Sequence, residues 1–281
     1  MIGGASGDML LGAMVSVGLN LDELKLELDK FHVSGFKLEQ KQVCRGGLTA
    51  VLVDVVLDKE GQRTRTWDNF YSLIADSDIE DSDKQTISKI FASLALAESA
   101  AHGGEVGSTH LHELGTVDTL VDIAAAVIGM RLLGIEKLYA SAFPVGIGQS
   151  SSSHGVMGAT SAATAAIYLN AGAPVRASGQ QPIGECVTPT GAAIVAALAS
   201  FDPIEFTPTK IGYGAGQRNP QNTANVLGLW LAESKFGWLE EGINGRGTDV
   251  TLLETNIDDS SGEVLGYVYE RLFEMGCLDV W

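Results

Sequence analysis

The chain has 281 residues, a length that allows one large domain or one domain followed by part of another. Hydrophobic residues make up 45% and charged residues 19%, which is typical of a folded globular protein and excludes a disordered or fibrous one. With 18 Lys and Arg against 35 Asp and Glu, the net charge is −17, so nucleic acid and anionic membrane surfaces are poor partners. Metal cations, or anionic substrates whose charge is masked by a bound cation, are better partners for such an acidic protein.

The cysteines Cys44, Cys186 and Cys277 are odd in number and far apart, which argues against a disulfide framework and against a Cys-x-x-Cys metal site. No stretch approaches the roughly 18 apolar residues of a membrane span. The first residues also lack the basic start and cleavage site of a signal peptide. We therefore expect a cytoplasmic protein.

The first third of the chain predicts two helices and a hairpin. Residues 8–17 form an apolar run that ends at a glycine, and Asn20 with Glu23 has capping-box spacing for a second helix. Residues 36–43 and 48–57 flank an Arg-Gly-Gly turn, so they predict a β-hairpin.

The middle of the chain predicts further helices. Ser82 with Gln85 has capping-box spacing before a long helix that ends at Gly103, and residues 117–133 form an apolar helix. Residues 137–143 then predict a strand.

Helix and strand continue to alternate after residue 150. Residues 159–170 predict an Ala-rich helix, and Thr188 followed by Pro189 is an N-cap with proline at the first helical position. Residues 226–232 predict the last strand before a glycine-rich linker. The expected fold class is therefore α/β, in the sense of mixed α+β.

The end of the chain predicts the start of another domain. We expect an N-terminal domain over 1–233, a linker over 234–248, and a strand, a helix and a new strand at 250–257, at 262–275 and from residue 278. A βαβ start of this length cannot bury its own faces. Residues 249–281 are therefore predicted to be an incomplete second domain.

A first candidate site combines imidazoles and carboxylates. In an extended segment His110 and His112 would point to the same side, next to Glu113, while Asp118 and Asp122 share one face of the following helix. Such ligands suit Ni, Zn, Fe or Mn. The alternative is a hydrogen-bonded histidine pair with Asp118 capping a helix.

A second candidate site is the glycine-rich start. Gly3, Gly4, Ser6 and Gly7 lead into a helix whose free N–H groups could hold a substrate phosphate, with Asp8 holding a cation beside it. An ordinary N-cap role for Ser6 is the alternative.

Other chemistry-bearing residues follow along the chain. His154 lies in a serine-rich loop and is either solvated or a ligand or proton carrier. Thr188 and Thr190 start a helix that could also face an anion, although capping explains them. Gly214 indicates either close approach to a ligand or a bulge. Cys186 suits a small buried role better than that of a nucleophile.

A last acidic turn precedes the final helix. Asp258, Asp259 and Glu263 could coordinate Mg²⁺ or Mn²⁺ beside a nucleotide, or could cap the helix through its dipole.

Taken in order, these motifs resemble the LarC family of nickel-insertion proteins. The similarity is carried by Gly-Ala-Ser-Gly-Asp-Met at 4–9, His-Leu-His-Glu at 110–113, Val-Asp at 117–118 and 121–122, Gly-Glu at 184–185, Val-Thr-Pro-Thr-Gly at 187–191, Gly-Tyr-Gly-Ala-Gly at 212–216, and Leu-Glu-Thr-Asn-Ile-Asp-Asp at 253–259. The last motif is the most specific.

The resemblance implies insertion of nickel into pyridinium-3,5-bisthiocarboxylic acid mononucleotide, with CTP consumed, to form the nickel-pincer cofactor. On this view the protein is a lyase of the cyclometallase type. The same resemblance implies a ferredoxin-like second domain that binds CTP with Mg or Mn.

Residue roles follow from the resemblance as expectations. Asp8 and His154 are the catalytic candidates, and the nickel ligands are expected at His110, His112, Glu113, Asp118 and Asp122. The substrate and CTP are expected to contact Gly3, Gly4, Ser6, Gly7, Thr188, Thr190, Gly214, Asp258, Asp259 and Glu263.

The family's nucleotide-binding domain continues beyond the position of Trp281, so the chain is expected to be C-terminally truncated. A separately encoded C-terminal piece and a homo-oligomer are therefore open as partners. The alternative function is a non-catalytic module, similar to a metallochaperone, that binds nickel or the cofactor precursor.

Overall fold

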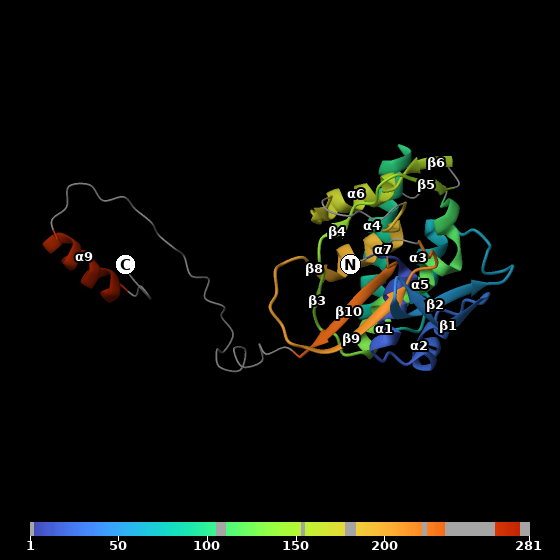
Figure 1. Ribbon diagram of the computed structural model, residues 1–281, viewed down its shortest axis with the longest axis horizontal. Coiled ribbons are helices and arrows are strands. Elements are labelled where there is room, and N and C mark those ends of the chain that lie inside the picture. The colour runs from blue at the N-terminus through green and yellow to red at the C-terminus, as the bar shows by residue number, and fades with distance from the viewer. Residues whose placement is uncertain are drawn as a thin grey trace. The chain divides into compact units, whose positions relative to one another are not determined.

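The computed structural model describes residues 3–104, 111–152, 155–177, 184–220, 224–233 and 262–275. Contacts between Cα atoms divide the chain into two units, Met1–Glu233 and Ser234–Trp281. Figure 1 shows helices and strands mixed within the first unit, so the predicted mixed α/β class is confirmed.

The main sheet of the first unit has four strands. In spatial order they are β1 (Phe36–Arg45), β2 (Leu48–Leu57), β9 (Pro208–Ala215) and β10 (Val226–Ala232). The β1–β2 and β9–β10 pairs are antiparallel, whereas β2 and β9 run parallel at Val51 and Gly214. The predicted hairpin and the predicted last strand are both confirmed.

Helix α1 (Gly7–Val17) packs on this sheet with very little space between the two backbones. A side chain on Gly214 would run into the backbone of Met9 and Ala13, and one on Gly212 would run into Ser16. The glycines of β9 therefore let the helix lie directly on the strand.

Helix α2 (Leu21–Asp29) begins where the capping-box spacing predicts it. The Asn20 side chain accepts hydrogen bonds from the backbone N–H of Asp22 at 2.9 Å and of Glu23 at 3.3 Å. The Glu23 carboxylate accepts from the side-chain amide of Asn20, at 3.4 Å, and so completes the local network through a side-chain contact.

The next two helices correct the prediction. Helix α3 (Trp67–Ala75) was not expected, although Thr66 and Asn69 form a full capping box. Helix α4 (Asp81–His102) has Glu80 at its N-cap position, without a side-chain capping hydrogen bond, so the predicted cap at Ser82 is wrong. Acidic side chains in the first turn interact favourably with the helix dipole and allow this earlier start. The helix ends at Gly103, as predicted.

Helix α5 (Val117–Leu132) follows the 3₁₀ turn η1 (His112–Gly115) and starts at the predicted residue. Its buried residues occur on all sides, because neighbouring helices surround it. This explains why most of the segment is apolar, apart from polar positions such as Asp118, Asp122 and Arg131.

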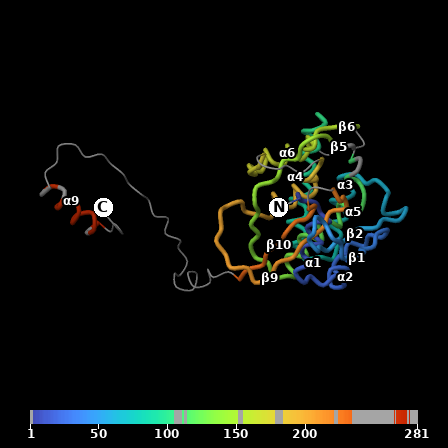
Figure 2. The backbone as a smooth tube through the Cα atoms, in the orientation of Figure 1, coloured from blue at the N-terminus to red at the C-terminus, as the bar shows by residue number. Residues whose placement is uncertain are grey.

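The strand predicted over 137–143 is replaced by two short strands with different partners. The two strands are separated at residues 140–142, where the chain passes from one partner strand to the other. The pairs are parallel, β3 (Leu138–Tyr139) with β8 (Ala199–Ser200) and β4 (Phe143–Pro144) with β7 (Val175–Arg176). Figure 2 shows this part of the chain running along one side of the unit toward β5 and β6.

A second hairpin and two capped helices complete the unit. The hairpin strands are β5 (Gln149–Ser152) and β6 (Gly155–Gly158), and the helices are α6 (Ala162–Ala171) and α7 (Pro189–Leu198). Helix α6 begins three residues later than predicted, at the cap Ser161. Helix α7 has the predicted cap, with the Thr188 hydroxyl accepting from the Gly191 N–H at 3.1 Å.

The core lies among α1, α3, α4, α5 and α7. Its largest fully buried side chains include Trp67, Phe70 and Phe91, whose rings contact one another with centroid separations of 6.5 and 5.1 Å. Each ring of this size contributes about 1.5–3 kcal/mol by burial.

In the second unit the described element is α9 (Gly262–Glu274), which confirms the predicted helix. The linker over 234–248, the strand over 250–257 and the strand from residue 278 lie outside the described residues. None of the helices within the described ranges is both long and apolar enough to cross a membrane.

Candidate functional site

A cavity of about 640 Å³ lies where the starts of several helices meet. The helix starts that line it are Ser6–Asp8 of α1, Asp118 and Thr119 of α5, Ser161–Ala163 of α6 and Thr188–Thr190 of α7. Helix N-termini present free N–H groups and the positive end of the helix dipole. The volume suits a nucleotide-sized small molecule.

A short backbone bridge holds two of these helix starts together. The Ala5 N–H donates to the Cys186 carbonyl and the Thr188 N–H donates to the Ala5 carbonyl, both at 3.0 Å. A side chain on Gly191 would collide with Ala5 and Ser6. The starts of α1 and α7 are therefore adjacent although they are far apart in sequence.

The glycine-rich start has two parts with different surroundings. A side chain on Gly3 would meet the backbone at Ala224, and one on Gly4, with φ of 134°, would meet the carbonyl of Cys186. Gly3 and Gly4 thus serve close packing of backbone and do not line the cavity, whereas Ser6 and Gly7 do.

Asp8 lies at the cavity wall, where opposing effects act on the pKa of its carboxyl group. Burial raises the pKa of its carboxyl. Hydrogen bonds from the Ser6 hydroxyl and from the backbone N–H of Met9 and Gln217 oppose this rise, while the negative charge of Asp54 adds to it. The burial effect dominates, so Asp8 takes up a proton more readily than an exposed aspartate.

Asp118 and Asp122 share one face of α5, as their spacing predicts, and both line the cavity. The Asp122 carboxylate fills the space where a side chain on Gly7 would lie. Burial raises the pKa of Asp122 well above its ordinary value, and the charges of Asp8 and Asp118 raise it further. The Thr116 hydroxyl donates to Asp118.

The predicted histidine arrangement needs a correction. Leu111 has helical backbone angles, φ of −74° and ψ of −7°, and His112 starts the 3₁₀ turn η1. The segment is therefore not extended at Leu111, because the turn into α5 begins there, and the period-two argument fails. His110 lies outside the described residues, as do the side chains of His112 and Glu113. Their ligand role stays a prediction.

Among the side chains that the structure describes, no group of three or more His, Cys, Asp or Glu is arranged to hold a metal ion. His154, Asp258 and Asp259 lie outside the described residues, and Glu263 is described only as part of the α9 backbone. Their roles also stay predictions.

Two further sequence candidates have structural explanations. The Cys186 thiol donates to the Pro144 carbonyl at 3.3 Å, and burial raises its pKa to about 11, which disfavours a nucleophilic thiolate. Gly214 does not line the cavity and packs against α1.

Several cavity residues were missed by the sequence reasoning. They are Asp54 of β2, Glu98 and His102 at the end of α4, and Gln217 and Arg218 after β9, whereas Glu185 before α7 was noted only as part of the Gly-Glu motif at 184–185. Glu98 had a detectable signal, since it is an acid on the apolar face of α4. Gln217 and Arg218 directly follow the glycine-rich motif at 212–216, but only the fold turns them toward the cavity.

An acid-lined cavity bounded by helix N-termini is typical of proteins that bind a charged small molecule or a metal cation. Comparison with known protein families narrows this class to one family. The chain belongs to the nickel insertion protein family, whose model matches residues 1–281.

Its relatives cover nearly the whole chain. A Roseiflexus castenholzii protein is 40% identical over 99% of this chain and 68% of its own length. Relatives from Citrifermentans bemidjiense and Dictyoglomus thermophilum are 39% and 33% identical over 99% of this chain and 70% and 69% of their own lengths. All three carry the provisional name nickel insertion protein. No solved structure matches the chain.

Proposed function

We propose that this chain inserts nickel into pyridinium-3,5-bisthiocarboxylic acid mononucleotide and so forms the nickel-pincer cofactor. The observation that carries the proposal is the gathering of Ser6–Asp8, Asp118, Asp122 and Thr188–Thr190 around one cavity in a member of the nickel insertion family. A mononucleotide and a divalent cation are the two charged species that such a lining suits.

The proposed chemistry forms one carbon–nickel and two sulfur–nickel bonds. Nickel, as a substrate, replaces the proton of a ring carbon, so the site must accept that proton. Asp8 and His154 are the proposed acceptors, and Asp8 lies at the cavity wall.

Nickel delivery is assigned to the other ionisable residues of the proposed site. His110, His112 and Glu113 directly precede α5, which carries Asp118 and Asp122 into the cavity lining. Imidazole with carboxylate is a ligand set that Ni²⁺ accepts.

CTP and a Mg or Mn ion belong to the proposal through the family resemblance. We assign them to a nucleotide-binding domain that begins in residues 249–281, with Asp258, Asp259 and Glu263 as contacts. The metal would neutralise the charge of the triphosphate when bound. The cytoplasm is the proposed compartment, because the described cysteines Cys44 and Cys186 are free thiols.

A second candidate function is a carrier that binds nickel or the precursor and requires a separate piece for catalysis. The observation that favours this carrier function is that the chain spans only 68–70% of the length of the relatives above.

One assay separates these two functions. The purified chain is incubated with Ni²⁺, the dithiocarboxylated mononucleotide, Mn²⁺ and CTP, and nickel incorporation and CMP release are followed by mass spectrometry. Nickel-containing product supports the enzyme. Retention of nickel or precursor without product supports the carrier, and binding of neither contradicts both.

The nickel ligands are tested separately by titration of Ni²⁺ into variants. Replacing both His110 and His112 by Ala should weaken nickel binding at least about tenfold. His32→Ala is the matched control, because His32 is an exposed histidine paired with Asp78 at 2.9 Å and does not line the cavity. Unchanged affinity in the double variant removes both residues as ligands.

A further inference from the structure

The cavity lining is strongly unbalanced in charge. Its acidic side chains are Asp8, Asp54, Glu98, Asp118, Asp122 and Glu185. Arg218 is the sole Lys or Arg in the described lining. The acidic side chains repel an anionic group on a ligand, so the position of Arg218 favours one part of the lining for such a group.

Arg218 is held loosely by its side chain and firmly by its backbone. Its guanidinium donates to the Glu185 carboxylate at 3.3 Å and to the Glu185 carbonyl at 3.4 Å, both long contacts, and the side chain is 58% exposed. The Asn225 side chain donates to the Arg218 carbonyl at 3.0 Å. The guanidinium can therefore exchange its partner while the chain around it stays in place.

The residues before Arg218 connect it to the acidic wall. The Gln217 side chain donates to Asp54 at 3.0 Å, and its backbone N–H donates to Asp8. The Arg45 guanidinium donates to the Gly216 carbonyl at 3.3 Å. This short segment thus has a fixed position beside the cavity.

The guanidinium and the start of α7 line the same cavity. Glu185, its ion-pair partner, precedes the cap Thr188 by three residues, and both line the cavity together with Thr190. At this start the Thr188 N–H donates to Ala5, the Gly191 N–H donates to the Thr188 hydroxyl, and Pro189 has no N–H. The planar guanidinium would therefore supply most of the donors to one tetrahedral anion, with the positive end of the helix dipole beside it.

We propose that Arg218 leaves Glu185 and binds the phosphate monoester of the substrate, with the start of α7 as the second part of this phosphate site. The assignment rests on the proposed function and specifies which end of the substrate lies at Arg218. The substrate ring then extends toward the cavity wall lined by Asp8 and Asp122.

The test uses isothermal titration of the full chain with nicotinic acid mononucleotide, with the corresponding nucleoside that lacks the phosphate, and with CTP. In Arg218→Gln the affinity for the mononucleotide should fall about 10- to 100-fold, while the affinity for the nucleoside should stay the same. Arg63→Gln is the charge-matched control, because Arg63 is exposed and does not line the cavity.

Glu185→Gln should have the opposite effect. It removes the competing partner of Arg218 and one negative charge beside the phosphate, so the mononucleotide should bind about two- to fivefold more tightly.

Three results would overturn the assignment. They are equal losses for mononucleotide and nucleoside in Arg218→Gln, a loss confined to CTP, and failure of the wild-type chain to bind the mononucleotide more tightly than the nucleoside. Each is distinguishable from failure of the proposed function, because nickel incorporation into the dithiocarboxylated substrate is measured separately in the wild-type chain.

Discussion

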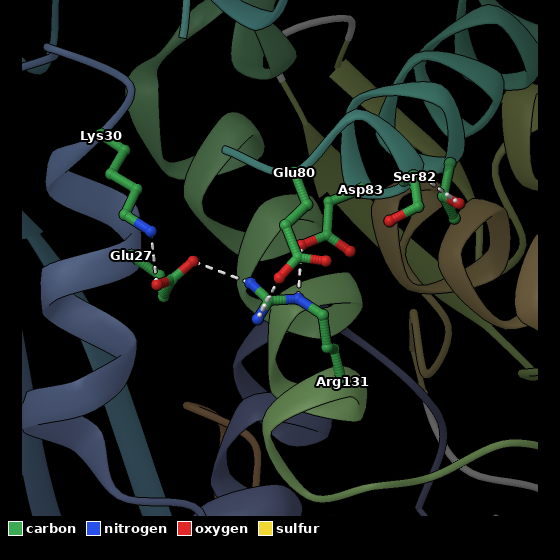
Figure 3. A network of polar contacts seen from close by, with 7 residues as sticks. Glu27, Lys30, Glu80, Ser82, Asp83 and Arg131 are labelled. Carbon is green, nitrogen blue, oxygen red and sulfur yellow. Dashed lines mark hydrogen bonds and ion pairs between the residues drawn. The ribbon is translucent and has the colours of Figure 1, made fainter. Parts of the chain in front are cut away.

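The Nη2 atom of Arg131 lies 2.7 Å from Oε2 of Glu27, and the same guanidinium contacts Glu80 at 3.0 Å and Asp83 at 2.8 Å. Figure 3 shows Arg131 between Glu27 on one side and Glu80 and Asp83 on the other. One side chain at the end of α5 therefore joins α2 to the start of α4. This network holds the helix that carries Asp118 and Asp122 into the cavity.

Replacing Arg131 by Met should lower the free energy of unfolding by about 2–4 kcal/mol, because Asp83 is left buried without its partner. Chemical denaturation monitored by circular dichroism measures this loss. Arg63→Gln removes an exposed arginine whose contact with Glu60 is 4.0 Å long, and it should change stability by less than about 0.5 kcal/mol. Equal effects of the two substitutions would contradict a stabilising role for the network.

The contribution of Glu27 should depend on pH in a defined direction. Burial acts to raise its pKa, but the hydrogen bonds and charges of Lys30 and Arg131 outweigh burial and lower it below 4.5. A carboxyl whose pKa is lower in the folded state than in the unfolded state stabilises the fold. This stabilisation is complete at pH values above the unfolded-state pKa, and it is lost as the pH falls through the folded-state pKa. The difference in unfolding free energy between wild type and Glu27→Gln should therefore be constant above about pH 5 and shrink below about pH 4.5.

Glu136→Gln provides the comparison for this series, because Glu136 is exposed just after α5. Its difference from wild type should stay small over the whole range. A wild-type to Glu27→Gln difference that grows on acidification would refute the assigned sign.

Asp122 should show the opposite pH behaviour. Its folded-state pKa is raised by burial and by neighbouring carboxylates, so its charged form destabilises the fold above that pKa, and this cost disappears as the pH falls toward 3.8. Asp122→Asn should therefore be more stable than wild type by about 1–2 kcal/mol near pH 8, with less gain near pH 4.

Thermal melts at the two pH values measure the Asp122 effect. Asp118→Asn, one turn away and supported by Thr116, is the matched substitution and should gain less. If Asp122→Asn is destabilised at both pH values, burial of the charge is not the dominant cost. Nickel binding is measured on the Asp122→Asn variant as well. Weaker binding would show that the carboxylate that destabilises the fold is also a nickel ligand.

Gly214→Ala should destabilise the first unit by about 3 kcal/mol or more, because its new methyl group would meet the backbone of α1. Gly228→Ala on the neighbouring strand is the control, since its methyl group would meet only the side chains of Tyr213 and Trp230 at 3.2–3.3 Å. Thermal melts compare them. Normal stability of Gly214→Ala would show that α1 can move away from β9.

Local signals in the sequence predicted the elements that they control. The Asn20 and Thr188 caps, the turn before Leu48 and the glycine after α4 each fix a boundary through contacts a few residues away. Helix α3 carried a comparable signal at Thr66 and Asn69, and only the Asn in place of the usual Glu or Gln concealed it.

The assembly of the site could not be predicted in this way. Ser6, Asp122 and Thr190 were selected as separate candidates, and their convergence depends on the Ala5–Val187 bridge and on the absence of a side chain at Gly7. No local sequence motif identifies Arg218 as a site residue. Its relevance comes from the turn after β9, which is positioned by long-range contacts.

The bridge between Ala5 and Val187, together with the hydrogen bond from the Gly3 N–H to the Val226 carbonyl at 3.0 Å, has a consequence for synthesis of the protein. A growing chain that has passed α5 already contains Asp8, Asp118 and Asp122, but it has neither α7 nor the turn after β9, which supply other parts of the lining. The lining of the cavity is therefore complete only when residues 184–218 have been synthesised and have packed beside α1 and α5.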